Sequence, residues 1–143
     1  MILRRKDRYH GASGNRLSTE SGEDYLVCIL ELVDTKGYAR VADVAHSLSV
    51  AEPSVSAMIK RLATRGYVER EKYRGFILTE SGNAIAHSIQ ARRRILSAFF
   101  RSLGLPQNVI RQDVHGLEHH LSQETLDCLE RLVKGDGLRT DHG

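Results

Sequence analysis

Hydrophobic residues recur at helical spacing in three stretches of the first half of the chain. This pattern predicts a helix from Ser21 to Lys36, a second over residues 39–48, and a third that begins at Pro53 and ends near Gly66. Proline is favoured in the first turn of a helix, and only about three to four residues separate the second and third helices. Such a short connection is typical of a helix-turn-helix.

The hydrophobic period changes after the third helix. Residues 67–73 are polar and extended in pattern, Arg74 and Gly75 form a turn signal, and residues 76–79 are mostly apolar. We therefore expect a β-hairpin with a basic tip. A hairpin placed directly after a helix-turn-helix is the wing of a winged helix, and we expect the domain to span residues 21–79.

Helical spacing returns in the second half of the chain. It predicts a long helix over residues 80–103, stopped by Gly104 and Pro106, and two further helices over 107–121 and 122–134. The predicted fold is mostly α, with an N-terminal winged helix-turn-helix followed by a helical lobe.

Composition excludes several classes of protein. The 143 residues are too few for a Rossmann or TIM-barrel enzyme, and no apolar run approaches the ~20 residues that cross a bilayer. The two cysteines have no metal-binding spacing, and the basic N-terminus precedes no apolar signal segment. We expect a cytoplasmic protein that is not an enzyme and has no membrane partner.

The positive charge is concentrated at the N-terminus. The net charge is +3, but the first 16 residues hold five basic residues and one acidic residue, which leaves 16 basic and 17 acidic residues beyond them. We expect residues 1–20 to form a flexible basic tail. The net charge of the chain therefore does not establish that its folded part binds DNA.

Local charge on the helix-turn-helix and wing is more informative. In such motifs the second helix enters the major groove and places its N-terminal residues at base edges, while basic side chains nearby contact phosphates. The predicted DNA-binding residues are Arg40, Glu52, Ser54, Ser56, Lys60, Arg61, Arg70, Lys72 and Arg74. The alternative is an ordinary solvated face on an interaction module that does not bind DNA.

A second cluster of chemistry-bearing residues lies near the C-terminus. On a continuous helix, His115, Glu118 and His119 would project from one face and form a chelate for a divalent transition metal. The spacing also matches the inverted zinc-protease signature, but the chain is short for a third ligand and a substrate cleft. The alternative to a metal site is a structural role, in which the cluster packs between helices and its histidines are hydrogen-bonded.

The predicted first helix offers two further candidate ligands. Asp24 is one, although Ser21 to Asp24 also fits a capping box with Ser21 as the N-cap. Cys28 lies one turn further on and would face the same side, although a lone cysteine on an amphipathic helix is more often part of the core.

Together these features resemble the manganese-responsive branch of the diphtheria-toxin-repressor family of metal-dependent transcription factors. The resemblance runs from about Ser21 to Leu132. It depends on four segments: Glu23-Asp24-Tyr25, Lys36-Gly37-Tyr38-Ala39-Arg40-Val41, Glu71-Lys72-Tyr73-Arg74-Gly75, and Asp113-Val114-x-Gly116-x-Glu118-His119-His120-Leu121-Ser122.

The resemblance implies a homodimeric repressor of metal-homeostasis genes that binds a double-stranded DNA operator. It implies that residues 80–143 form a dimerisation and metal-binding domain. It also implies that a divalent metal, manganese, iron or zinc, lies between the winged helix and this domain and controls the separation of the two recognition helices.

The implied ligand set is only partly present. Asp24, Glu118 and His119 match it, whereas Val27, Arg93 and His115 stand where the family has a glutamate, a histidine and a glutamate. Losing carboxylates and gaining a histidine favours zinc, iron or cobalt over manganese.

Two readings follow from the altered ligands. In the first, Asp24, His115, Glu118 and His119, with or without Cys28, still form a metal switch. In the second, Arg93 fills the pocket as a bound cation, pairs with Asp24 or Glu118, and leaves a regulator that needs no metal.

Overall fold

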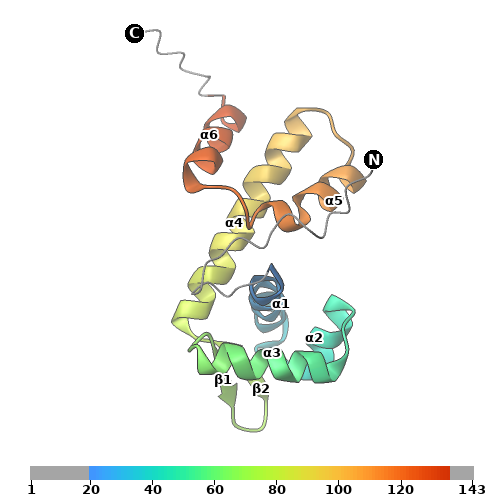
Figure 1. The fold of residues 1–143 in the computed structure, drawn as a ribbon, viewed down its shortest axis with the longest axis vertical. Helices are drawn as coiled ribbons and strands as arrows, with labels where there is room; N and C mark the ends of the chain where they lie inside the picture. Colours follow the sequence, from blue (N-terminus) through green and yellow to red (C-terminus); the bar gives the residue numbers. More distant parts are fainter. Residues whose placement is uncertain (1–19, 136–143) are drawn as a thin grey trace, which may run out of the picture.

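The computed structural model describes residues 20–135 as six helices and one two-stranded sheet (Figure 1). The mostly α fold predicted from the sequence is confirmed. The predicted tail before residue 20 and the C-terminal residues 136–143 lie outside the described residues. No helix among the described residues is long and apolar enough to cross a membrane. In chain order the elements are α1 (Glu20–Lys36), α2 (Val41–Leu48), α3 (Glu52–Thr64), β1 (Val68–Glu71), β2 (Gly75–Leu78), α4 (Glu80–Ser102), α5 (Gln107–Leu117) and α6 (Gln123–Val133).

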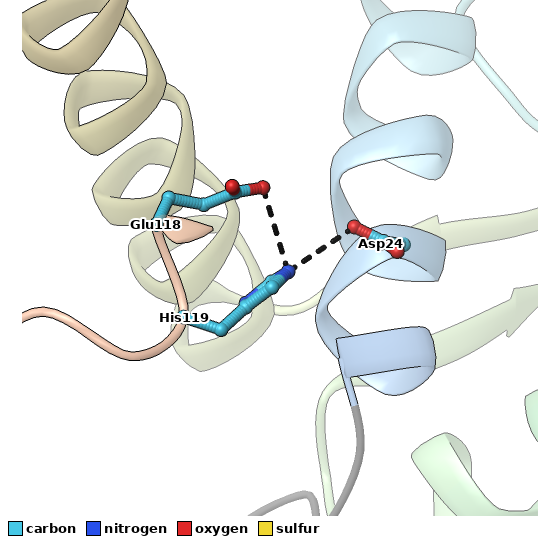
Figure 2. Close-up of side chains that lie close together, drawn as sticks. All are labelled: Asp24, Glu118 and His119. Atoms are coloured by element: carbon cyan, nitrogen blue, oxygen red, sulfur yellow. Dashed lines mark hydrogen bonds and ion pairs between the residues drawn. The ribbon is translucent and has the colours of Figure 1, made fainter. Parts of the chain in front are cut away.

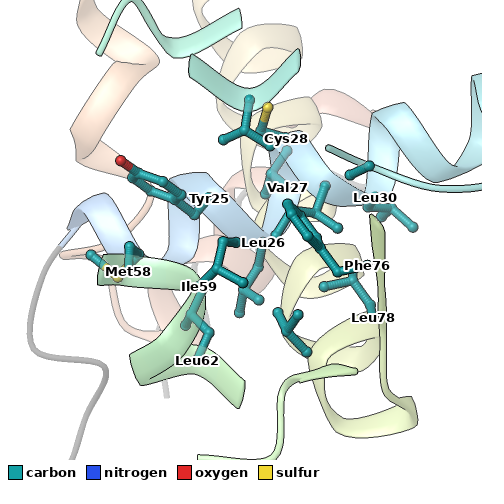
Figure 3. Close-up of a cluster of buried hydrophobic side chains, with 14 of the residues drawn as sticks. Tyr25, Leu26, Val27, Cys28, Leu30, Met58, Ile59, Leu62, Phe76 and Leu78 are labelled. Atoms are coloured by element: carbon teal, nitrogen blue, oxygen red, sulfur yellow. The ribbon is translucent and has the colours of Figure 1, made fainter. Parts of the chain in front are cut away.

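The N-terminal lobe is a winged helix built around α1. Ser49 ends α2 in the left-handed conformation, and Pro53 lies in the first turn of α3, so the connection between the two helices is tight. The apolar faces of α1, α2 and α3 meet the inner face of the hairpin and the start of α4 in one core (Figure 3). Its largest fully buried members are Leu26, Ile29, Val44, Val55, Ile59 and Leu62.

The wing is an antiparallel hairpin attached to the lobe by a further backbone bridge. Val68 pairs with Leu78 and Glu71 with Gly75 across the two strands. Ala39 and Phe76 exchange backbone hydrogen bonds of 2.9 Å in both directions. The tip residue Tyr73 has a φ of 72° and is 89% exposed, so it projects into solvent.

Helix α4 is the element that both lobes share. The hydroxyl of Thr79 caps its first turn by accepting a hydrogen bond from the Gly82 amide. Near its start Ala86 and Ile89 belong to the N-terminal core. Further along, Leu96 belongs to a second, smaller core, whose other buried members are Ile110, Val114 and Leu126.

The helix predicted over residues 107–121 is too long. Its regular backbone breaks at His115, where ψ is 111°, and at Gly116, where φ is 96°. Glycine adopts this left-handed conformation at little cost and is a common helix terminator, so Gly116 ends the regular part of α5. Glu118 and His119 therefore lie on a short turn, and the expectation that they share one helix face with His115 is wrong.

The contact between the wing and Ala39 generates a stability prediction. A Cβ added at Gly75 would lie 2.2 Å from the carbonyl oxygen of Ala39, and the φ of Gly75 is +106°. We expect Gly75→Ala to lower the free energy of unfolding by about 3 kcal/mol, because the bridge must open or the backbone must strain. Chemical denaturation measures this change.

Gly104→Ala is the matched control. Gly104 also has a positive φ, of +80°, but nothing lies within 4 Å of its added Cβ. Gly104→Ala should lower the free energy of unfolding only through its unfavourable backbone conformation, by about 1 kcal/mol. Equal losses in the two variants would contradict the steric explanation.

Candidate metal centre

Three candidate ligands meet where the two lobes join. Asp24 projects from α1, while Glu118 and His119 project from the turn after α5 (Figure 2). Each offers one ligand atom, and these atoms lie within 4.8 Å of one another. Asp24 and Glu118 are 94 positions apart in the chain, so the fold brings together residues from opposite ends of the described segment.

Glu118 has the most unusual environment of the three. Its exposed fraction is 0%, and among the charged residues that the structure describes it is the one that is completely buried. Its Oε1 atom is paired, but its Oε2 atom is buried and has no hydrogen-bond partner among the described residues. An unpaired buried carboxylate oxygen is costly, so this atom is a strong candidate ligand.

His119 is surrounded by carboxylates. Its Nδ1 atom contacts Glu23, and its Nε2 atom lies 3.3 Å from Oδ1 of Asp24 and 3.5 Å from Oε1 of Glu118. Burial alone would lower the pKa of His119, but the hydrogen bonds to Asp24 and Glu23 and the nearby Glu118 charge outweigh it and raise the pKa to about 9. In the protein without metal, His119 is therefore an imidazolium at neutral pH.

Asp24 is held in its charged form. Burial raises the pKa of its carboxyl group, but the hydrogen bond with His119 and the positive charges of His119 and Arg93 lower the pKa further than burial raises it. Helix α1 begins at Glu20, so Ser21 lies inside the helix and the capping-box interpretation of Asp24 is wrong. The side chain of Asp24 is instead directed to the centre.

Arg93 makes the contact predicted for it, with both carboxylates. Its Nε atom donates to Oε1 of Glu118 at 2.7 Å, and its Nη2 atom donates to Oδ1 of Asp24 at 2.6 Å. The adjacent Arg92 donates to the backbone carbonyls of Glu118 and Leu121, which attaches the turn to α4.

Two side chains of the centre were missed by the sequence reasoning. Glu23 enters the sequence motifs only as the residue before Asp24, and Arg92 is marked only by its place beside Arg93 in a run of three arginines. In both cases the single available signal was adjacency to a candidate residue.

The other two proposed ligands lie outside the three-residue group. His115 is exposed, because the backbone break at Gly116 separates it from Glu118 and His119. Cys28 is 6% exposed and packs in the N-terminal core (Figure 3), where burial raises the pKa of its thiol. The three grouped donors are two carboxylates and one imidazole.

The candidate DNA-binding residues all lie on the outer surface of the winged helix. Val55, Met58, Ile59 and Leu62 point into the core, which leaves the opposite face of α3 to solvent. Exposed positions are Glu52, Ser54, Ser56, Lys60 and Arg61 on α3, Arg40 before α2, and Arg70, Lys72 and Arg74 on the wing. The Arg40 guanidinium lies 5.1 Å from the centre of the Tyr38 ring.

Comparison with protein families decides the class. Residues 18–76 match the family described as iron dependent repressor, N-terminal DNA binding domain, and residues 79–135 match its metal binding and dimerisation domain. The chain belongs to the iron-dependent repressor family. This confirms the resemblance to the diphtheria-toxin repressors, and members of this family are transcriptional regulators that use a divalent metal.

Several solved structures resemble this chain. The manganese regulator SloR is 29% identical with a TM-score of 0.72, and the match covers 79% of this chain and 53% of that one. IdeR of T. acidophilum is 33% identical with a TM-score of 0.69, and the match covers 77% and 53%. ScaR with bound Zn2+ is 27% identical with a TM-score of 0.69, and the match covers 79% and 53%. The chain thus spans about half the length of these relatives.

The donors of the centre fit a divalent metal such as the matched metal-binding domain implies. The buried Oε2 atom of Glu118 is free to coordinate, and Asp24 is charged. Carboxylate and imidazole donors together suit zinc, iron and manganese. Coordination by Nε2 of His119 requires loss of its proton, so metal affinity should rise with pH.

The charge on His119 predicts how stability depends on pH in chelator. Because the pKa of His119 is about 9 in the folded protein against an ordinary value of 6.5, its contribution to stability is complete below pH 6.5 and is lost as pH rises through 9. We expect the free energy of unfolding to fall by about 2 kcal/mol between pH 7 and pH 9.5. Urea denaturation across this range measures it.

His119→Gln isolates this contribution. The variant keeps a polar side chain that does not titrate, so its stability should show little of the decline between pH 7 and pH 9.5. An equal decline in both proteins would mean that other groups cause it.

Proposed function

We propose that this chain forms a homodimeric, sequence-specific DNA-binding regulator, a repressor of metal-homeostasis genes, whose DNA binding is controlled by a divalent transition metal. The observation that carries the proposal is the placement of the donors. Asp24 belongs to the DNA-binding lobe, and Glu118 and His119 belong to the C-terminal lobe. Such a regulator acts in the cytoplasm on the chromosome and is not an enzyme.

The metal site joins the two lobes. Asp24, Glu118 and His119 would hold the ion, and a bound ion supplies a positive charge that all three donors share. Through Asp24 such an ion would connect α1 to the turn that carries Glu118, while Glu23 remains as a partner for the other side of the His119 ring. Zinc, iron(II) and manganese(II) are the ions to test.

In a dimer this connection affects the two recognition helices. Operator half-sites are centred about one helical turn, ~34 Å, apart, so a dimer binds well only when its α3 helices have a matching separation. A metal that favours one arrangement of α1 relative to the C-terminal lobe shifts the population toward that separation. The second reading, in which Arg93 replaces the metal altogether, predicts DNA binding that a chelator does not change.

The metal switch is tested by gel shift with the DNA upstream of the protein's own gene. We expect added zinc, iron(II) or manganese(II) to tighten binding by at least about 10-fold relative to chelator, a typical allosteric coupling. His119→Ala should remove this response. His87→Ala is the matched control, because His87 is exposed on α4 and outside the three-donor group. A shift of equal strength in chelator and in every metal would contradict the switch.

The DNA-binding face is tested by its salt dependence. We expect Lys72→Ala and Arg74→Ala to weaken binding to all sequences and each to reduce the slope of log affinity against log salt by about 1, as loss of a phosphate contact does. Ser54→Ala and Ser56→Ala should instead change base preference, because these positions lie at the N-terminal end of α3.

Arg101→Ala controls for loss of charge alone. Arg101 is exposed in the last turn of α4, away from the winged helix, so its removal should leave the salt slope unchanged. Equal effects at Arg101 and Arg74 would indicate a response to net charge instead of a contact surface.

A further inference from the structure

Arg93 lies on α4 between the two hydrophobic cores. Ile89, one turn before it, belongs to the N-terminal core, and Leu96, about one turn after it, belongs to the second core. The side chain of Arg93 is only 28% exposed. Its guanidinium is therefore an inward-directed cation at the junction of the lobes.

This guanidinium uses the same carboxylates that would bind a metal. It takes Oδ1 of Asp24 and Oε1 of Glu118, which leaves one oxygen of Glu118 buried and unpartnered. Asp24 and Glu118 come from different lobes, so Arg93 already makes the connection that a metal ion would make. An arginine suits this role because its planar group presents several donors at once and keeps its charge.

The positive charge of Arg93 also opposes the binding of a metal ion to these carboxylates. Two positive charges that share the same anions at short range repel each other, and the repulsion is strong where solvent is largely excluded. The ion would also have to divert Glu118 Oε1 and Asp24 Oδ1 from good hydrogen bonds. Occupancy by metal thus has an electrostatic cost that a neutral side chain at position 93 would not impose.

Arg92 holds the turn that carries Glu118 and His119 in place without a metal ion. Its two hydrogen bonds to the carbonyls of Glu118 and Leu121 hold the ligand-bearing turn against α4. The turn therefore has its position before a metal arrives, and Arg93 needs only to connect it to α1.

We propose that Arg93 is a resident cation of the centre, which joins the two lobes in the metal-free protein and raises the metal concentration at which the switch responds. This inference rests on the proposed metal switch and concerns its threshold. Arg93 would thereby raise the stability of the metal-free protein and lower the affinity of the centre for metal. Arg93 is a positioning residue that acts through Asp24 and Glu118.

The test uses the full chain with Arg93→Gln. In chelator, we expect its melting temperature to fall by at least about 3 °C, since a bridge between the lobes is lost. In competition titrations against a chromophoric chelator, we expect zinc and manganese each to bind at least about 10-fold more tightly than to the unaltered chain, because one positive charge is removed.

Two further variants sharpen the test. Arg94→Gln removes the same charge from the next residue of α4, which is exposed, and should change neither quantity appreciably. Arg93→Lys keeps the charge but loses the planar group that reaches both carboxylates. It should lower the melting temperature in chelator while changing metal affinity less than about 3-fold. It also serves as the informative variant if Arg93→Gln does not fold.

The proposal is overturned if Arg93→Gln melts in chelator like the unaltered chain, or if its metal affinity is equal or weaker. An unchanged melting temperature of Arg93→Lys in chelator, or metal binding tenfold tighter in that variant, would also overturn the proposal. These results are separate from the proposed function, which fails when metal does not alter the gel shift of the unaltered chain. A metal-dependent shift with unchanged affinity in Arg93→Gln would overturn the resident cation alone.

Discussion

The arrangement of the two lobes depends on a buried anion that needs a cation. The Glu118 carboxylate is completely enclosed, and a buried charge without a partner would cost several kcal/mol. Arg93 from α4 supplies the partner, and the same guanidinium reaches Asp24 on α1. This ionic contact thus links α1 of the N-terminal lobe to the turn of the C-terminal lobe, in addition to the connection that α4 makes by packing into both cores. His119 and Glu23 extend it into a network in which each carboxylate has a positively charged neighbour.

The position of this network along α4 suits it to the control proposed above. Each lobe has its own hydrophobic core, and α4 contributes to both, but its middle contributes charged side chains. Apolar packing holds each lobe together strongly and without regard to ions. The junction is held by electrostatic contacts, whose strength depends on protonation and on bound cations. The sensitive contacts therefore lie where the relative placement of the lobes is decided.

Much of this architecture could be predicted from the sequence, because it depends on local patterns. Helical spacing, Pro53 at the start of α3 and the change of period at Tyr67 predicted the winged helix, and the family motifs predicted Asp24, Glu118 and His119 as a group. The contact of Arg93 was predicted because a ligand position had become cationic. The break at Gly116 was missed, since the apolar period continues through it. Glu23 and Arg92 were missed because their roles depend on how distant segments pack, which no spacing in the sequence records.

Helix α4 also has a mechanical consequence. It runs without interruption for 23 residues, or about 35 Å at 1.5 Å per residue, and the whole winged helix is packed on its first turns. The ionic centre contacts it near its midpoint. A change of about 5° in the tilt at that point moves a group ~20 Å away by roughly 2 Å. A small tilt of α4 at the ionic centre would therefore displace the whole winged helix, including α3, which is packed at the start of this helix (Figure 1).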